Sequence, residues 1–448
     1  MTDQPAKRIM QISTHGYVSA DIEFGMPDTG GQVVYVLELS KCLARFGYQV
    51  DIFTRQFEDQ PRFQQVSDNC RIVRIPCGGK DFLPKETICE AIPEWIQNAN
   101  AFIKENNLAY DFINSHYWDA GLAGMGVANA FNITHIHTPH SLGAWKRANM
   151  DGEPDELEAK YNFNRRVRDE TVLFDECDGI IATTPQQRDL LRGEFYGVAP
   201  DKINVIPPGY DDTRFFPVSK ASRAALKLQY GYEGRIVLAL GRIARNKGYD
   251  LLIQAMEKVC HRNEDVKLLL AIGSTEPNRQ EREMTEELKQ LAQKLRLGKR
   301  VIFADYIPDD ELPDYYRLAD VFALSSRYEP FGMTAVEAMA CGTPLVCTTE
   351  GGLWERLDWG LNGIYANPFD PYEYGSAIHH ALAHPRLWNQ LSRNGAHRAR
   401  ADFTWIGIGQ QVINMIKGPS IARVGEGAED DDPRFADVAG APSEIVQP

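Results

Sequence analysis

Short aliphatic runs, each followed by a glycine-containing loop and then a helical segment, most constrain the fold of this chain. The first unit starts at 8–13, passes through Asp28-Thr29-Gly30-Gly31-Gln32 and continues into a helix over 33–45 and a strand over 49–54. A second unit begins with the aliphatic run 235–240, followed by a glycine-bracketed loop and a helix over 249–261. Parallel strands need such crossover connections, so the repetition predicts an α/β chain with parallel sheets.

The pattern divides the chain into two halves. Further strands are expected in the first half at 70–75, 112–115, 134–138, 179–182 and 204–210, and in the second at 267–272, 301–303, 320–324, 345–347 and 363–365. We therefore predict two Rossmann-like, doubly wound parallel-sheet domains facing across a cleft, where ligands of such sheets bind. The dinucleotide fingerprint GxGxxG is absent, which disfavours a nicotinamide oxidoreductase.

Charge and composition exclude several other classes. The net charge of −14 argues against nucleic acid as a main partner. The eight cysteines form no CxxC pair and no Cys/His metal spacing, which is typical of reduced cytosolic thiols. The first seven residues are polar, and no apolar run approaches the length of a membrane span. We expect a cytoplasmic protein with no signal peptide.

Two carboxylates flank the start of a predicted helix at 334–340. Glu329 precedes the turn Pro330-Phe331-Gly332, and Glu337 lies one turn inside the helix, so both can face one cleft. Backbone N–H groups at a helix start suit an anionic or hydroxyl-rich ligand. The pair could act as general acid and base, as in glycoside hydrolysis, or it could hold sugar hydroxyls. Glu337 could also lie on a solvated helix face.

A basic loop follows the strand at 235–240. Arg242 and Lys247 stand five residues apart between glycines, and a diphosphate needs such cations presented by a tight loop. The alternative is an exposed basic loop that caps the next helix. In the first half, the two glycines of the 28–32 loop would let a ligand approach the backbone, unless the fold alone requires the turn.

Several histidines and cations of the first half are ambiguous by themselves. His135 and His137 share one strand face, and without a Cys or carboxylate at ligand spacing they are interpreted as strand histidines satisfied by neighbours. His140 stands apart because it follows a strand end. We interpret Lys85, Lys146 and the pair 165–166 as ordinary surface charges unless the fold brings them together at one site.

Taken in this order, the motifs resemble those of the retaining glycosyltransferases of family 4, which have the GT-B fold. The resemblance covers roughly residues 8 to 417. Glu329 and Glu337 resemble the Glu-x7-Glu motif of that family. Arg242 and Lys247 match its donor-phosphate cations, and His140 matches its active-site histidine.

Within the family, the segments 28–36, 76–79, 82–86 and 140–143 resemble enzymes that use fructose 6-phosphate as acceptor. These are the sucrose-phosphate synthases and the mannosylfructose-phosphate synthases, which the four segments resemble equally. The segments 141–146, 206–212, 215–219 and 246–253 look more like those of the mannosyl enzymes. No residue selects GDP over UDP, or mannose over glucose, on chemical grounds.

The resemblance assigns roles to the candidate residues. It implies that Lys85, Lys146 and Arg166 bind the acceptor phosphate, while Gly31 and Gln32 contact its sugar. On the donor side it implies that Glu337 holds the ribose of the nucleotide. The donor-sugar hydroxyls would bind Glu329 and the backbone from Phe331 through Gly332 and Met333 to Thr334. Catalysis would fall to His140, Arg242, Lys247 and Glu329.

The resemblance also implies the reaction and the domain roles. A hexosyl group would pass with retention from a nucleotide sugar, as co-substrate, to fructose 6-phosphate, with GDP-mannose as the favoured donor. UDP-glucose is the alternative donor, and a non-catalytic sugar-nucleotide-binding regulator is the alternative function. No tightly bound cofactor and no divalent metal is expected. A downstream sugar phosphatase is the one protein partner expected.

The expected boundaries follow from this assignment. They are 1–216 for the acceptor-binding domain, 217–395 for the nucleotide-sugar domain, 396–420 for a C-terminal helix crossing back to the first domain, and 421–448 for a tail. The tail carries an acidic run with glycines and prolines, which is typical of disorder.

Overall fold

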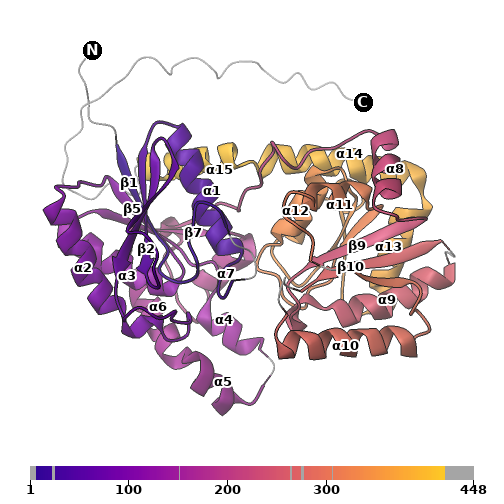
Figure 1. Cartoon of the computed structure of the whole chain (residues 1–448), viewed down its shortest axis with the longest axis horizontal. Coiled ribbons are helices and arrows are strands. Elements are labelled where there is room, and N and C mark those ends of the chain that lie inside the picture. Colours follow the sequence, from indigo (N-terminus) through magenta and orange to yellow (C-terminus); the bar gives the residue numbers. More distant parts are fainter. Residues whose placement is uncertain are drawn as a thin grey trace, which may run out of the picture.

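The computed structural model describes residues 7–22, 26–150, 152–262, 265–273, 277–304 and 306–418. The acidic segment 421–448 lies outside these residues. Two sheets, each covered by helices on both faces, stand side by side (Figure 1). The two-domain α/β fold expected from the sequence is therefore confirmed. Among the described residues, no helix has the length and apolarity needed to cross a membrane.

The first sheet has the strand order β3-β4-β2-β1-β5-β6-β7-β8. Its strands are β1 (Arg8–Ile12), β2 (Gln49–Gln56), β3 (Phe63–Ser67), β4 (Cys70–Pro76), β5 (Phe112–His116), β6 (Thr134–Thr138), β7 (Gly179–Ala182) and β8 (Ile203–Val205). All but one of its neighbouring pairs are parallel. The central strands β1 and β5 are almost fully buried because helices cover both faces, and besides apolar residues they contain buried polar ones, Gln11, Asn114, Ser115 and His116.

The edge strand β3 corrects the expectation of a purely parallel sheet. It pairs antiparallel with β4 and has an alternating, half-exposed pattern. Its sequence Phe-Gln-Gln-Val-Ser lacks the apolar run that marks a buried strand, so the sequence pattern did not predict it.

Helices of the first domain form two layers. The helix bounds are α1 (Gly31–Arg45), α2 (Ile92–Glu105), α3 (Trp118–Phe131), α4 (Gly143–Ala148), α5 (Pro154–Tyr161), α6 (Phe163–Glu176) and α7 (Pro185–Arg192). α1 buries its apolar face against one side of the sheet, and α2 and α3 cover the other.

The second sheet has the order β11-β10-β9-β12-β13-β14 and is parallel throughout. Its strands are β9 (Arg235–Gly241), β10 (Val266–Ile272), β11 (Val301–Ala304), β12 (Val321–Leu324), β13 (Leu345–Thr348) and β14 (Ile364–Ala366). The helices are α8 (Lys220–Gln229), α9 (Tyr249–Arg262), α10 (Arg279–Lys294), α11 (Leu312–Leu318), α12 (Met333–Ala340), α13 (Pro371–Ala383), α14 (Pro385–Asp402) and α15 (Trp405–Lys417). α9, α10 and α13 share one core, and α11 and α12 pack in the other.

The chain returns to the first domain through its last helix. α14 runs across the expected boundary between 395 and 396, so the chain leaves the second domain only after Asp402. α15 then lies against α1 (Figure 1), where the Cys42 thiol donates a hydrogen bond to the Trp405 carbonyl at 3.1 Å. A Cβ on Gly409 would lie 2.6 Å from the Cys42 sulfur, so the two helices approach closely because this position is glycine.

Candidate functional site

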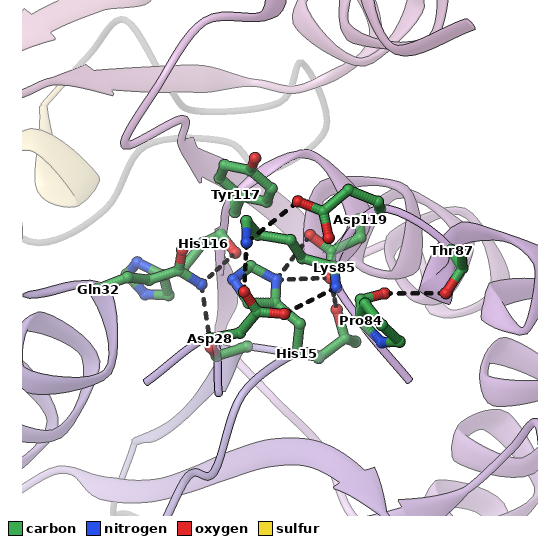
Figure 2. Close-up of polar contacts among 12 residues, drawn as sticks. His15, Asp28, Gln32, Pro84, Lys85, Thr87, His116, Tyr117 and Asp119 are labelled. Carbon is green, nitrogen blue, oxygen red and sulfur yellow. Dashed lines mark hydrogen bonds and ion pairs between the residues drawn. The ribbon is translucent and has the colours of Figure 1, made fainter. Parts of the chain in front are cut away.

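Three loops of the first domain meet where β1, β5 and β6 end. Parallel strands bring their carboxyl ends to one edge of the sheet, so His15, His116 and His140 come together although they are distant in sequence. At the start of α1, the Gln32 side-chain amide donates to the Ser13 hydroxyl at 3.2 Å and to the His116 carbonyl at 3.3 Å. Gln32 thus lies among these loops, as Figure 2 shows.

His140 occupies an unusual backbone position directly after β6. Its φ of 57° lies in the left-handed region, which costs free energy for a residue other than glycine. The imidazole contacts the His116 ring and the edge of the Tyr35 ring. Burial, aided by the nearby His15, lowers the pKa of His140 to about 3. The side chain is therefore neutral at physiological pH.

The other two histidines of β6 have a structural role. His135 Nε2 and His137 Nδ1 both lie within hydrogen-bond distance of the Ser115 hydroxyl, at 2.7 and 2.8 Å. Ser115 therefore contacts one ring nitrogen of each histidine, as expected for strand histidines, whereas His137 Nε2 is buried and has no hydrogen-bond partner among the described residues. Across the described residues, no group of three or more His, Cys, Asp or Glu side chains is placed to hold a metal ion.

The three candidate acceptor cations converge. Burial, followed by the charges of Arg166 and Lys85, lowers the pKa of Lys146 to about 8. Both Arg166 and Lys85 thus act on the charge of Lys146. The Lys146 ammonium also lies 4.7 Å from the centre of the Tyr161 ring. Lys85 is paired with Asp28 and Glu86, and Arg166 with Glu170, whereas Lys146 forms no ion pair with a carboxylate of the described residues. Lys146 is therefore the cation of the three that is available to an anionic ligand.

Lys85 is held by a carboxylate of the glycine loop. Its ammonium and its backbone N–H both bind the Asp28 carboxylate, which Figure 2 shows beside His15. Burial acts to raise the pKa of Asp28, but the hydrogen bonds from Lys85 outweigh it, and the pKa is lowered. Asp28, whose φ is 53°, thus orients Lys85 beside Gly31 and Gln32.

Arg166 differs from the other two cations because its side chain is buried and hydrogen-bonded within the fold. Its side chain is 3% exposed and donates to the Glu170 carboxylate at 2.7 Å, to the Tyr117 hydroxyl at 2.8 Å and to the carbonyl and hydroxyl of Ser141 at 2.9 Å. Glu170 also accepts the N–H of Gly143, the first residue of α4, at 2.9 Å. Since Lys146 lies on α4, Arg166 also positions Lys146.

Sequence reasoning missed a buried contact between a histidine and a carboxylate next to this cluster. His15 Nδ1 lies 2.9 Å from Asp119, whose carboxylate is fully buried and also accepts the Thr14 hydroxyl at 2.5 Å. The His15 ring meets the edge of the Tyr117 ring at 4.8 Å. The available signals were a histidine shortly after the first strand and a carboxylate in the sequence His-Tyr-Trp-Asp at the end of β5.

In the second domain, the basic loop and the Glu329 turn are in contact. The Lys247 ammonium lies 2.6 Å from Glu329 Oε2, which also accepts the Ser326 hydroxyl at 3.0 Å. An ion pair between Arg327 and Asp250 at 2.6 Å joins the same two loops. Arg242 is exposed, and within the described part of the chain its guanidinium makes no hydrogen bond or ion pair.

The two glutamates of the motif have different partners. Glu337 accepts a hydrogen bond from the Tyr316 hydroxyl at 2.7 Å. Burial raises the pKa of Glu337 to about 7, although the Tyr316 hydroxyl acts in the opposite direction. Between the two glutamates, Gly332 is the N-cap of α12; its φ is 98°, and a Cβ there would lie 2.9 Å from Leu324 Cδ2. Only glycine fits this turn without strain.

The two halves of the site face each other. The starts of α1 and α12 meet, because a Cβ on Gly31 would lie 3.6 Å from the Met333 sulfur. The rings of Trp145 on α4 and Tyr328 on the Glu329 turn have centres 3.7 Å apart. The structure therefore brings the candidate acceptor cations of the first domain and the candidate donor loops of the second to one interface.

Comparisons with known proteins agree with this architecture. Residues 29–214 match the family described as Glycosyltransferase Family 4, and residues 227–398 match Glycosyl transferases group 1. Mannosylfructose-phosphate synthase from Agrobacterium fabrum is 50% identical over 94% of both chains. A D-inositol 3-phosphate glycosyltransferase from Corynebacterium jeikeium is 32% identical over 89% of this chain and 93% of its own.

A solved structure has the same two-domain arrangement. Sucrose-phosphate synthase from Thermosynechococcus elongatus superposes with a TM-score of 0.79 at 31% identity, covering 92% of this chain and 98% of its own. The expected enzyme class is confirmed by these relatives, which are named as glycosyltransferases and synthases. The chain is a glycosyltransferase and belongs to the GT-B family that includes mannosylfructose-phosphate synthase.

Proposed function

We propose that this enzyme transfers a mannosyl group from GDP-mannose to fructose 6-phosphate, with retention of the anomeric configuration. The observation that carries the proposal is the position of Lys146, which lies near Lys85 and Arg166 and forms no ion pair with a carboxylate of the described residues, because a phosphate on the acceptor would supply the missing negative charge. The identity to mannosylfructose-phosphate synthase supports mannose as the transferred sugar.

On the donor side, Arg242 and Lys247 would bind the diphosphate. Negative charge develops on that group as the glycosidic bond breaks, and preorganised cations stabilise the charge in the transition state. Lys247 now donates to Glu329 and retains further N–H groups for a phosphate oxygen. Glu329 and the backbone from Phe331 through Gly332 and Met333 to Thr334 would hold sugar hydroxyls. Glu337 would hold the ribose.

On the acceptor side, Gly31 and Gln32 would contact the fructosyl group. Its hydroxyl would attack the anomeric carbon from the face that the diphosphate leaves, and a phosphate oxygen would take the proton. His140 would line the reacting centre as a neutral imidazole. The contact between Trp145 and Tyr328 would help to exclude water, which otherwise hydrolyses the donor.

Sucrose-phosphate synthase activity is the second candidate, supported by the 31% identical structure. The deciding experiment incubates the enzyme with fructose 6-phosphate and either GDP-mannose or UDP-glucose and measures nucleotide release. Faster release from GDP-mannose, with an α-configured product by ¹H NMR, is expected. Nucleotide release from UDP-glucose alone would show that the enzyme transfers glucose instead of mannose. Donor binding without release would favour a sugar-nucleotide-binding regulator.

The remaining expectations extend the same proposal. We infer that the enzyme works without a tightly bound cofactor or divalent metal, so that turnover persists in excess EDTA. Loss of turnover in EDTA, restored by Mg²⁺ or Mn²⁺, would contradict this. A cytoplasmic location and a sugar phosphatase acting on the product also stay predictions.

A further inference from the structure

A basic hollow lies on the second domain. It has a volume of about 520 Å³ and lies beside the first turns of α8 and α14 and the loop after α12, in the upper right part of Figure 1. Four cations line it, Lys220, Arg223, Arg386 and Arg393, and no carboxylate does so among the described residues. None of these residues belongs to the candidate site described above.

This local charge contrasts with the rest of the protein. The chain carries a net charge of −14, yet the segments 217–229 and 384–401 contain no Asp or Glu. Lys220 and Arg386 lie in the first turns of their helices, neither of which has an acidic residue there. Cations at helix N-termini oppose the helix dipole, so this arrangement is unfavourable until an anion binds.

One of the four cations has a purely structural role. Arg223 donates to the carbonyls of Gly342 and Ala319, and its guanidinium lies 4.9 Å from the centre of the Trp388 ring. The Ser392 hydroxyl also donates to the Gly342 carbonyl, at 2.6 Å. Arg223 and Ser392 thus satisfy the backbone carbonyls near the end of α12, and the other three cations take no part in these hydrogen bonds.

The other three cations are available to a ligand. Lys220, Arg386 and Arg393 are exposed, and no carboxylate of the described residues pairs with them. Asp320, whose charge acts on Arg223, already forms an ion pair with Lys227 at 2.5 Å. Three unpaired cations around one hollow therefore repel one another, and a bound anion would relieve that repulsion.

We propose that this hollow binds a small phosphate-bearing molecule at a second site, separate from the donor and acceptor sites. A volume of about 520 Å³ suits a small ligand rather than a macromolecular surface. The forked guanidinium groups of Arg386 and Arg393 match two phosphate oxygens, and Lys220 adds a third charge. The Asn389 and Gln390 amides offer hydrogen bonds to hydroxyls of the same ligand.

Calorimetric titration at low ionic strength tests the proposal, with inorganic pyrophosphate and fructose 6-phosphate as separate probes. The wild type should bind pyrophosphate at two classes of sites. The double variant Arg386→Ala/Arg393→Ala should lose affinity at one class by at least about tenfold, because each charged hydrogen bond contributes roughly 1.5–3 kcal/mol. If the double variant binds only pyrophosphate more weakly, the hollow is a site for free phosphates. If it binds both probes more weakly, the hollow also accepts sugar phosphates.

The matched control is Lys294→Ala/Lys299→Ala, which removes two exposed cations elsewhere on the same domain. It should bind like the wild type, and both variants should keep the wild-type unfolding midpoint because the four side chains are exposed. Equal weakening in both double variants, or a wild-type isotherm for Arg386→Ala/Arg393→Ala, would overturn the proposal. This result does not depend on which sugar the enzyme transfers.

Discussion

His116 Nδ1 lies 3.0 Å from His140 Nε2, and His116 Nε2 lies 2.7 Å from the Gln11 side-chain oxygen. The oxygen can only accept, so His116 carries its proton on Nε2. Burial lowers the pKa of His116 well below its usual value, so the ring is neutral and its Nδ1 must accept. His140 therefore donates from Nε2 and keeps a free electron pair on Nδ1.

The first prediction is that this chain of hydrogen bonds fixes the tautomer of His140. ¹⁵N NMR of labelled histidine should show His140 as the neutral Nε2–H form, with no titration between pH 5 and 8. His116→Leu should lower kcat about tenfold, the cost of one buried hydrogen bond of roughly 1–1.5 kcal/mol. Gln11→Glu is the opposite test, because a carboxylate beside Nε2 favours the charged His116 ring, whose Nδ1 then donates instead of accepting. An Nδ1–H form of His140 in the wild type would reverse the assignment.

The second prediction concerns Lys247 and Glu329. Lys247→Ala should lower kcat by about 10²–10³-fold, the usual effect of removing one stabilising donor, while the fold stays intact. Initial rates and far-UV circular dichroism check both parts. Glu329→Gln tests the partner separately, since the amide oxygen still accepts from Lys247. Wild-type rates in Lys247→Ala would remove the lysine from the mechanism.

The third prediction separates the two functions of Arg166. Arg166→Ala should raise the KM for fructose 6-phosphate far more than the KM for the donor, because it removes a cation and releases α4. It should also lower the free energy of unfolding by about 3–5 kcal/mol, since the buried Glu170 loses its partner. Lys146→Ala is the control, because it should raise the same KM without that loss of stability. Equal effects on both KM values would argue against acceptor binding.

The fourth prediction is a pH effect on the acceptor alone. The pKa of Lys146 is lowered to about 8, so its positive charge is present below pH 8 and lost above it. A phosphate binds the charged form, and kcat/KM for fructose 6-phosphate should therefore fall as the pH rises through about 8. Lys146→Arg stays charged and should show no such fall. The same decline in both enzymes would assign it to another group.

Much of the fold could be predicted from the sequence because its signals are local. Each parallel strand coincides with a segment expected from the sequence, and helical periodicity placed α1, α9 and α12 within about two residues of their observed bounds. The sequence did not predict β3, because an edge strand with alternating exposure has no apolar run. The expected boundary between 395 and 396 lies inside α14, which continues without a breaking residue until Asp402.

The sequence predicted those residues of the candidate site that belong to recognisable motifs. Glu329, Lys247 and His140 follow strand ends in motif-like stretches, whereas the partners that hold them in place do not. Asp119 has the sequence context of an ordinary first-turn helix carboxylate, and only its burial against His15 shows its role. Such pairings arise when distant loops meet at one sheet edge, and no local pattern records them.

The fifth prediction concerns Glu337 and the donor. Burial raises the pKa of Glu337 to about 7, so the carboxylate is ionised above pH 7 and protonated below it. An ionised carboxylate is the stronger acceptor for ribose hydroxyls, so the KM for the nucleotide sugar should fall as the pH rises through about 7. Tyr316→Phe removes the hydrogen bond that opposes this shift, and it should move the transition to higher pH. Donor binding measured by calorimetry between pH 5.5 and 8.5 checks both expectations. A pH-independent donor affinity in the wild type would show that Glu337 does not hold the ribose as an ionised carboxylate.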